Sequence, residues 1–125
     1  MSQARNMTWE ADVFDAPMLV RDQERVYKSR MVLIVDSASG YVLVVRAFPR
    51  QTSPLQALED ALVTSIRKHR TTPKILRVRD AKTADGLNNL AQTFSLTIRH
   101  GGRLPALTIA KRSLTATLKK ERKGT

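Results

Sequence analysis

MVLIVDSASGYVLVV, residues 31–45, places one aspartate and a short turn between two apolar runs. Residues 31–35 are consecutively apolar, which is typical of a strand buried on both faces of a sheet, and therefore of a central strand. Residues 37–40 are turn formers, and Gly40 can adopt a positive φ. Residues 41–48 predict a second strand, so the two runs make an antiparallel hairpin. Asp36 is either a carboxylate at the end of a buried strand or the residue that opens the turn.

A helix with a well-marked beginning follows the hairpin. Ser53 can cap this helix, Pro54 suits its first position, and Gln56 stands where a capping box has its glutamine. The apolar stripe of the helix consists of Leu55, Leu58, Leu62 and Ile66, widened by Ala61. Its last turn is basic, and cations there complement the negative end of the helix dipole. These charges therefore have a structural explanation before any ligand is considered.

The remainder of the chain alternates strands and helices. The sequence predicts strands over 73–80 and 95–102, and helices over 83–94 and 104–123. Before the hairpin, residues 9–30 predict one or two strands, with Pro17 near an edge or a turn. Trp9 and Phe14 are most simply core anchors.

These elements predict a single α/β domain over residues 9–119. The strands and helices after the hairpin form a β-α-β-α-β-α order, which requires parallel strands joined by right-handed crossovers. We therefore expect a mixed sheet with an antiparallel hairpin at its N-terminal side. Residues 1–8 are expected to be a flexible N-terminus and residues 120–125 a basic C-terminal tail.

This layout resembles that of ribonuclease H-like and integrase-like folds, on the stretches VLIVDSASGYVLVV and PKILRVRD. The chain is also similar to a family of short bacterial domains of unknown function, found largely in cyanobacteria. That similarity rests on the VLIVDSASGYVL hairpin, the P-x-x-L-x-V-R strand and the later LPAL. The resemblance implies a ribonuclease H-like fold and no particular activity.

Two aspartates are the candidates for metal-dependent nuclease chemistry of the ribonuclease H type. Asp36 stands where the resemblance puts the first carboxylate, and Asp80 resembles the second. A two-metal site needs several converging carboxylates, and the last helix has no acid before Glu121. As the simpler alternative, Asp36 caps a turn and Asp80 closes a strand. We expect no enzyme activity, metal or cofactor, while a nuclease or integrase-like enzyme using Asp36 and Asp80 remains an alternative.

The net charge of +11 is concentrated in the second two-thirds of the chain. Residues 1–45 contain five Lys or Arg and six acids, whereas residues 46–125 contain 17 Lys or Arg and five acids. Such an asymmetry favours a polyanionic partner. Solvated helix faces explain part of the excess but not all of it. The sequence has no cysteine, no secretory signal and no run long enough to cross a bilayer, so we expect a cytoplasmic protein with no membrane partner.

We therefore predict a non-catalytic module that binds DNA or RNA through phosphate contacts, with weak sequence specificity, as an accessory subunit of a larger nucleoprotein assembly. An adaptor that docks on an acidic protein is the alternative. The candidate nucleic-acid-binding residues are Arg67, Lys68, Arg70, Arg77, Arg79, Arg99, Arg103, Lys111, Arg112, Lys119, Lys120, Arg122 and Lys123.

Overall fold

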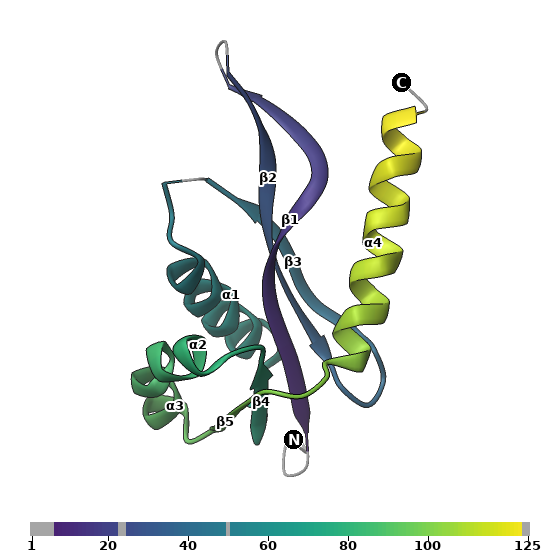
Figure 1. The fold of residues 1–125 in the computed structure, drawn as a ribbon. Helices are drawn as coiled ribbons and strands as arrows, with labels where there is room; N and C mark the ends of the chain where they lie inside the picture. Colours follow the sequence, from purple (N-terminus) through teal and green to yellow (C-terminus); the bar gives the residue numbers. More distant parts are fainter. Residues whose placement is uncertain (1–6, 23–24, 50, 124–125) are drawn as a thin grey trace.

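The fold is built on one five-stranded mixed sheet (Figure 1). The computed structural model describes residues 7–22, 25–49 and 51–123, and the side chains of 7–15, 30–49 and 51–117. The strands are β1 (Thr8–Asp22), β2 (Arg25–Asp36), β3 (Val42–Phe48), β4 (Ile75–Val78) and β5 (Thr97–His100), in the spatial order β3-β2-β1-β4-β5. The ladders β3-β2 and β2-β1 are antiparallel, and β1-β4 and β4-β5 are parallel. The predicted mixed α/β sheet is therefore confirmed.

The strand that ends at Asp36 is an interior strand, as its unbroken apolar run predicts, but another strand occupies the middle of the sheet. The hairpin strand ending at Asp36 is β2, second from one edge, whereas the centre is the 15-residue strand β1. The segment expected to hold one or two short strands thus pairs with β2 on one side and β4 on the other. Its ladder with β2 shifts register between Asp15 and Leu19, the stretch that contains Pro17, because proline cannot donate a ladder hydrogen bond.

The helices cover the two faces of the sheet unequally (Figure 1). The helices α1 (Pro54–His69), α2 (Ala81–Gly86) and α3 (Asn88–Phe94) lie on one face, and α4 (Pro105–Lys123) lies on the other. The single helix predicted over 83–94 is two short helices meeting at the buried Leu87. A Cβ on Gly86 would lie 2.7 Å from Leu55 Cδ2, so a glycine there lets α2 approach α1 closely.

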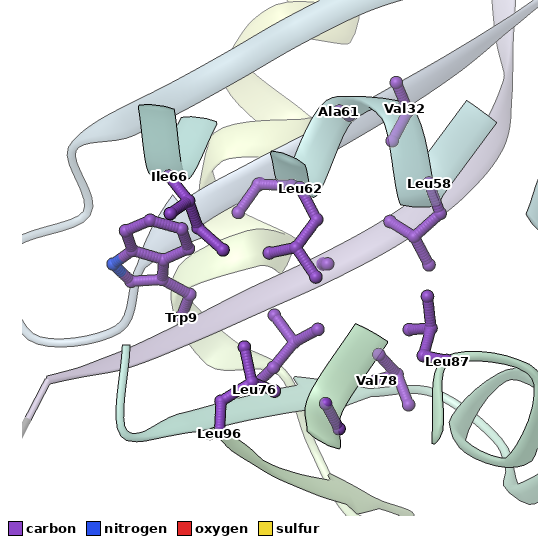
Figure 2. Packing of buried hydrophobic residues seen from close by; sticks show 13 residues of the cluster. Trp9, Val32, Leu58, Ala61, Leu62, Ile66, Leu76, Val78, Leu87 and Leu96 are labelled. Atoms are coloured by element: carbon purple, nitrogen blue, oxygen red, sulfur yellow. The ribbon is translucent and has the colours of Figure 1, made fainter. Parts of the chain in front are cut away.

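Alternation along β1 and β2 divides the core into two layers. Trp9, Ala11, Val32 and Ile34 pack with α1, α2 and α3 in the larger cluster, where Trp9 adjoins Ile66 (Figure 2). The smaller cluster, beneath α4, consists of Phe14, Met31, Leu33, Val35, Leu104 and Leu107. All five residues of 31–35 are buried, as their unbroken apolar run predicts, because successive side chains point to opposite faces and both faces are covered. The predicted core roles of Trp9 and Phe14 are confirmed.

The beginning of α1 agrees with its sequence signals except in one contact. Ser53 caps the helix, with its Oγ accepting from the backbone N–H of Gln56 at 3.1 Å, and Pro54 is the first helical residue. The Gln56 side chain donates forward to Asp60 Oδ1 at 2.9 Å, so the reciprocal half of the capping box is not formed.

None of the described helices has the length and apolar character needed to cross a membrane.

A buried carboxylate holds the second layer in place. Glu10, on β1, is fully buried, and its Oε1 accepts from the backbone N–H of Leu107 at 2.9 Å, in the first turn of α4. Its Oε2 accepts from the hydroxyl of Ser37 at 2.6 Å, in the turn between β2 and β3. One side chain therefore fastens the helix and the hairpin turn to the central strand, and it supplies an acceptor to a helix N-terminus that needs one.

Replacing Glu10 tests this arrangement. We expect Glu10→Ala to lower the free energy of unfolding by about 3 kcal/mol, because one buried and one partly buried donor lose their acceptor. Glu10→Gln keeps an acceptor for Leu107 and should cost about 1 kcal/mol. Urea unfolding followed by far-UV circular dichroism measures both, with the exposed Asp85→Ala as control. An effect of Glu10→Ala no larger than that of the control would contradict the assignment.

Candidate functional site

Asp36 belongs to the hairpin turn. Its Oδ2 accepts from the backbone N–H of Ser39 at 2.8 Å and from the Ser39 hydroxyl at 2.6 Å. Gly40, with φ of +77°, completes the turn by donating its backbone N–H to the Asp36 carbonyl at 2.8 Å. These contacts agree with the interpretation of Asp36 as the residue that opens the turn.

Asp80 begins a helix. Its Oδ1 accepts from the backbone N–H of Thr83 at 2.8 Å and caps α2. This hydrogen bond lowers the pKa of Asp80, with smaller contributions from the Thr83 hydroxyl and from the nearby cations Lys82 and Arg79. The carboxylate is therefore held in its ionised form as a cap.

The structure does not bring Asp36 and Asp80 together. Asp36 lies opposite Trp9, and Trp9 lies beside Leu76 on the other side of the sheet. Asp80 follows Leu76 by four residues along a direction that rises about 3.3 Å per residue, so the two aspartates are separated both along and across the strands. The strand that ends in Asp36 runs antiparallel to β1, whereas β4, which leads to Asp80, runs parallel to it, and this pairing separates the two aspartates.

A carboxylate that the sequence reasoning missed lies at the Asp80 end of the sheet. Asp12 is on the central strand, and its Oδ2 accepts from Arg79 Nη2 at 2.7 Å and Nε at 3.0 Å. The Asp12 side chain is 13% exposed and that of Arg79 58%. The hydrogen bond to Asp12 and the charge of that carboxylate raise the pKa of Arg79. The available signal was the spacing of Glu10 and Asp12, two residues apart, which puts both carboxylates on one face of a strand.

The described residues contain no group of three or more His, Cys, Asp or Glu side chains that could hold a metal ion. Near Asp12, the charged partner is instead the guanidinium of Arg79. The side chain of Glu121, the one acid of the last helix, lies outside the described residues. The local chemistry is thus that of an ion pair between β1 and the residue that follows β4.

The Asp12–Arg79 pair lines one wall of a cleft of about 480 Å³, which we call the strand-edge cleft. The cleft lies beside residues 11–13 of β1, where β4 ends and where α1 and α2 begin. Its apolar lining comes from Ala11, Val13, Pro54, Leu55 and Leu58. Its cations are Arg30, Arg79 and Lys82. Arg30 is 3.7 Å from Asp15 Oδ1 and lies over the Phe48 ring at 5.9 Å.

The predicted row of arginines on β4 and β5 is present on one face of the sheet. Arg77 and Arg99 are direct neighbours in the parallel ladder, and alternation puts Arg79 on the same face. Arg77 Nη2 donates to the carbonyl of Arg103, in the segment that crosses this face from β5 to α4 (Figure 1). Arg99 and Arg103 are exposed.

The two flanks of α4 differ in character. Lys111 and the exposed Arg112 lie on one flank, with Lys111 Nζ 4.7 Å from the Phe14 ring on β1. The opposite flank, with Ala106, Ile109 and Ser113, borders a groove of about 670 Å³ that also touches the turn between β2 and β3.

The cations of β4, β5, the following loop and α4 are together called the basic surface: Arg77, Arg79, Arg99, Arg103, Lys111 and Arg112. The side chains of Lys119, Lys120, Arg122 and Lys123 lie outside the described residues.

The remaining three candidates lie apart from the basic surface. Arg67, Lys68 and Arg70 are exposed at the C-terminal end of α1, on the other face of the sheet. His69 beside them contacts the ring of Tyr41 edge to face, with centroids 5.9 Å apart. The structure therefore divides the predicted binding residues between two faces.

The capping role of Asp80 predicts a pH dependence. Because its folded pKa is lowered below the ordinary value of 3.8, its contribution to stability is present above pH 3.8 and is lost as the pH falls through the folded pKa. Asp80→Asn, which keeps a capping oxygen, should thus be less stable than the wild type at pH 7 and equally stable by about pH 2. Thermal unfolding across that range measures the difference, with Asp85→Asn as a surface-charge control. A difference that persists at low pH would contradict the assignment.

The architecture matches that of retroviral integrase cores. The catalytic core domain of BIV integrase is 18% identical, with a TM-score of 0.69, over 94% of this chain and 72% of that one. The HTLV-2 integrase catalytic core domain in complex with magnesium is 16% identical, with a TM-score of 0.64, over 93% and 71% of the two chains. At such identities the likeness concerns the fold alone. No curated protein matches the sequence.

The predicted resemblance to a domain of unknown function is also confirmed. The model of one such family, DUF6930, matches residues 1–115. With a ribonuclease H-like, integrase-core fold and a family match that spans most of its length, this chain belongs to the DUF6930 family of domains of unknown function.

Proposed function

We propose that this protein is a non-catalytic nucleic-acid-binding module, and that the basic surface engages the phosphate backbone. It would act as an accessory subunit of a nucleoprotein assembly. The observation that carries the proposal is the coincidence of two sets of cations on one side of the sheet. The arginines of β4, β5 and the following loop lie on the face that α4 covers, and Lys111, packed on Phe14, directs one flank of α4 toward β1.

The composition of this surface favours phosphate contacts over base recognition. Arg99, Arg103 and Arg112 are exposed, and guanidinium groups bind phosphate oxygens in a bidentate manner. Among the described residues, Tyr41 is the exposed large aromatic, and it lies beside His69 away from the basic surface. A stacking platform of the kind that single-strand-binding proteins use is therefore not part of the proposal.

The Asp12–Arg79 pair supports the non-catalytic part. A two-metal mechanism clamps the attacking and leaving oxygens between two cations held by several carboxylates. Here the carboxylate of Asp12, beside the end of β4, is bound by a guanidinium through two hydrogen bonds. A divalent ion would have to displace Arg79 and would find its positive charge beside the site.

Fluorescence anisotropy with labelled single- and double-stranded DNA and RNA, without and with Mg²⁺, tests the proposal. We expect binding whose affinity falls steeply with salt, because phosphate contacts release counterions, and a probe that stays intact. Arg99→Glu should weaken binding about fivefold or more and lower the salt slope by about 1. Arg67→Glu, on the other face of the sheet, is the matched control and should have a smaller effect.

Three outcomes would count against this reading. An equal loss in both variants would contradict the assignment to the basic surface. No binding even at low salt would overturn nucleic-acid binding as such. Mg²⁺-dependent cleavage that is lost in Asp12→Asn would instead favour an integrase-like enzyme, the alternative that the fold keeps open.

A second candidate, an adaptor for a protein partner, has its own observation. The groove beside the apolar flank of α4 exposes Val42 by 41% and Ile109 by 67%. Apolar exposure of this kind suits an apolar peptide or helix, and the net charge of +11 favours an acidic one. Competition between an acidic peptide and nucleic acid distinguishes the two functions, because Ile109→Asp should impair peptide binding alone.

A further inference from the structure

We infer that the strand-edge cleft binds a nucleotide, with the phosphate among its cations and the nucleoside against its apolar lining. The inference rests on the proposed function and deepens it, since the nucleotide is either free or the terminal unit of a bound strand. The cleft is distinct from the basic surface, because its lining comes chiefly from the α1 and α2 side of the sheet. Arg79 is the residue that the two share.

The position and size of the cleft suit a small ligand. It lies at the carboxyl end of β4 and beside residues 11–13 of β1, the strand that pairs antiparallel with β2 and parallel with β4. Ligands of open α/β sheets commonly bind outside the carboxyl ends of strands. Its volume of about 480 Å³ lies within the usual range for small-molecule sites.

The charges of the cleft favour a ligand whose negative charge is concentrated in one group, as in a phosphate monoester. Arg30 of β2, Arg79 after the end of β4 and Lys82 of α2 all line the cleft. The two acids on the lining, Asp12 and Asp80, are engaged by Arg79 and by the Thr83 backbone N–H respectively. Lys82 forms no salt bridge among the described residues, so its ammonium is available to a phosphate.

The apolar part of the lining selects against inorganic phosphate alone. Ala11, Val13, Leu55 and Leu58 form a patch on which a sugar or a base loses water-exposed surface. Pro54 and the beginning of α1 also border the cleft, and the first turn of that helix contains no acid. The positive end of a 16-residue helix adds to the field of the cations.

The carboxylate of Asp12 competes with the phosphate of the ligand for the guanidinium of Arg79. A phosphate that binds Arg79 must share or replace the carboxylate now held at 2.7 Å. Removing the negative charge with Asp12→Asn frees the guanidinium and should strengthen nucleotide binding, by about fivefold for an interaction of about 1 kcal/mol. A metal site predicts the opposite sign, because asparagine there would weaken the binding of Mg²⁺.

Isothermal titration of the full chain with AMP, with adenosine and with inorganic phosphate tests the site directly. We expect AMP to bind more tightly than either of the other two. Lys82→Glu should reduce AMP affinity about fivefold or more, whereas the exposed Lys74→Glu, at the other end of β4, should leave it within twofold. Circular dichroism verifies that each variant is folded. Equal binding of AMP by the wild type and Lys82→Glu, or none by the wild type, would overturn the inference.

Oligonucleotides distinguish the two sources of the nucleotide. A linear 5′-phosphorylated single strand should bind better than its circular form if the cleft takes a strand end, and equally well if it takes a free nucleotide. Salt-dependent binding of a circular strand, unaffected by Lys82→Glu, belongs to the basic surface. If the protein binds the circular strand but no AMP, the cleft inference is overturned and the proposed function stands. If the protein does not bind the circular strand, the proposed function is overturned.

Discussion

The two hydrogen bonds of Glu10 are the constraint on which the second layer of this fold depends. A carboxylate that is fully buried is costly unless its oxygens are satisfied. Here both oxygens accept, one from the first turn of α4 and one from the β2–β3 turn. The contact with Leu107 joins residues 97 positions apart, so it fixes where the last helix begins relative to the central strand. The location of the groove beside α4 and the contact of Lys111 with Phe14 both depend on where that helix begins.

Because α4 begins over Glu10, its two flanks acquire different surroundings. The helix lies over β1 and β2, where Leu107 packs with Leu33 and Val35. One flank therefore borders the apolar groove near β3, and Lys111 on the other stands over Phe14. The same helix separates an apolar surface from a basic one. This separation is what permits a nucleic-acid partner and a protein partner to be assigned to different sides of one small domain.

The sequence predicted the elements with strong local signals and missed those whose signals are distant. Residues 31–35 and the α1 cap were predicted because burial on both faces and the N-terminal Ser-Pro pattern leave local marks. β1 was not recognised as central, because Glu10 and Asp12 place acids at positions that face the sheet interior. Their partners lie 27 to 97 residues away in sequence, at Ser37, Arg79 and Leu107. No pattern within a window of ten residues reports such pairs.

The contacts that form the candidate site also join residues distant in sequence. Asp36 ends the most apolar strand, yet antiparallel pairing places it beside Trp9, whereas Asp80 lies beyond the carboxyl end of β4. Asp12 reaches the relevant end because β1 runs parallel to β4. Its neighbour is then the residue that follows Val78, and in this chain that residue is an arginine. The arginine at that position makes the carboxylate of Asp12 half of an ion pair, and this pair is the feature from which we propose that the cleft binds an anion.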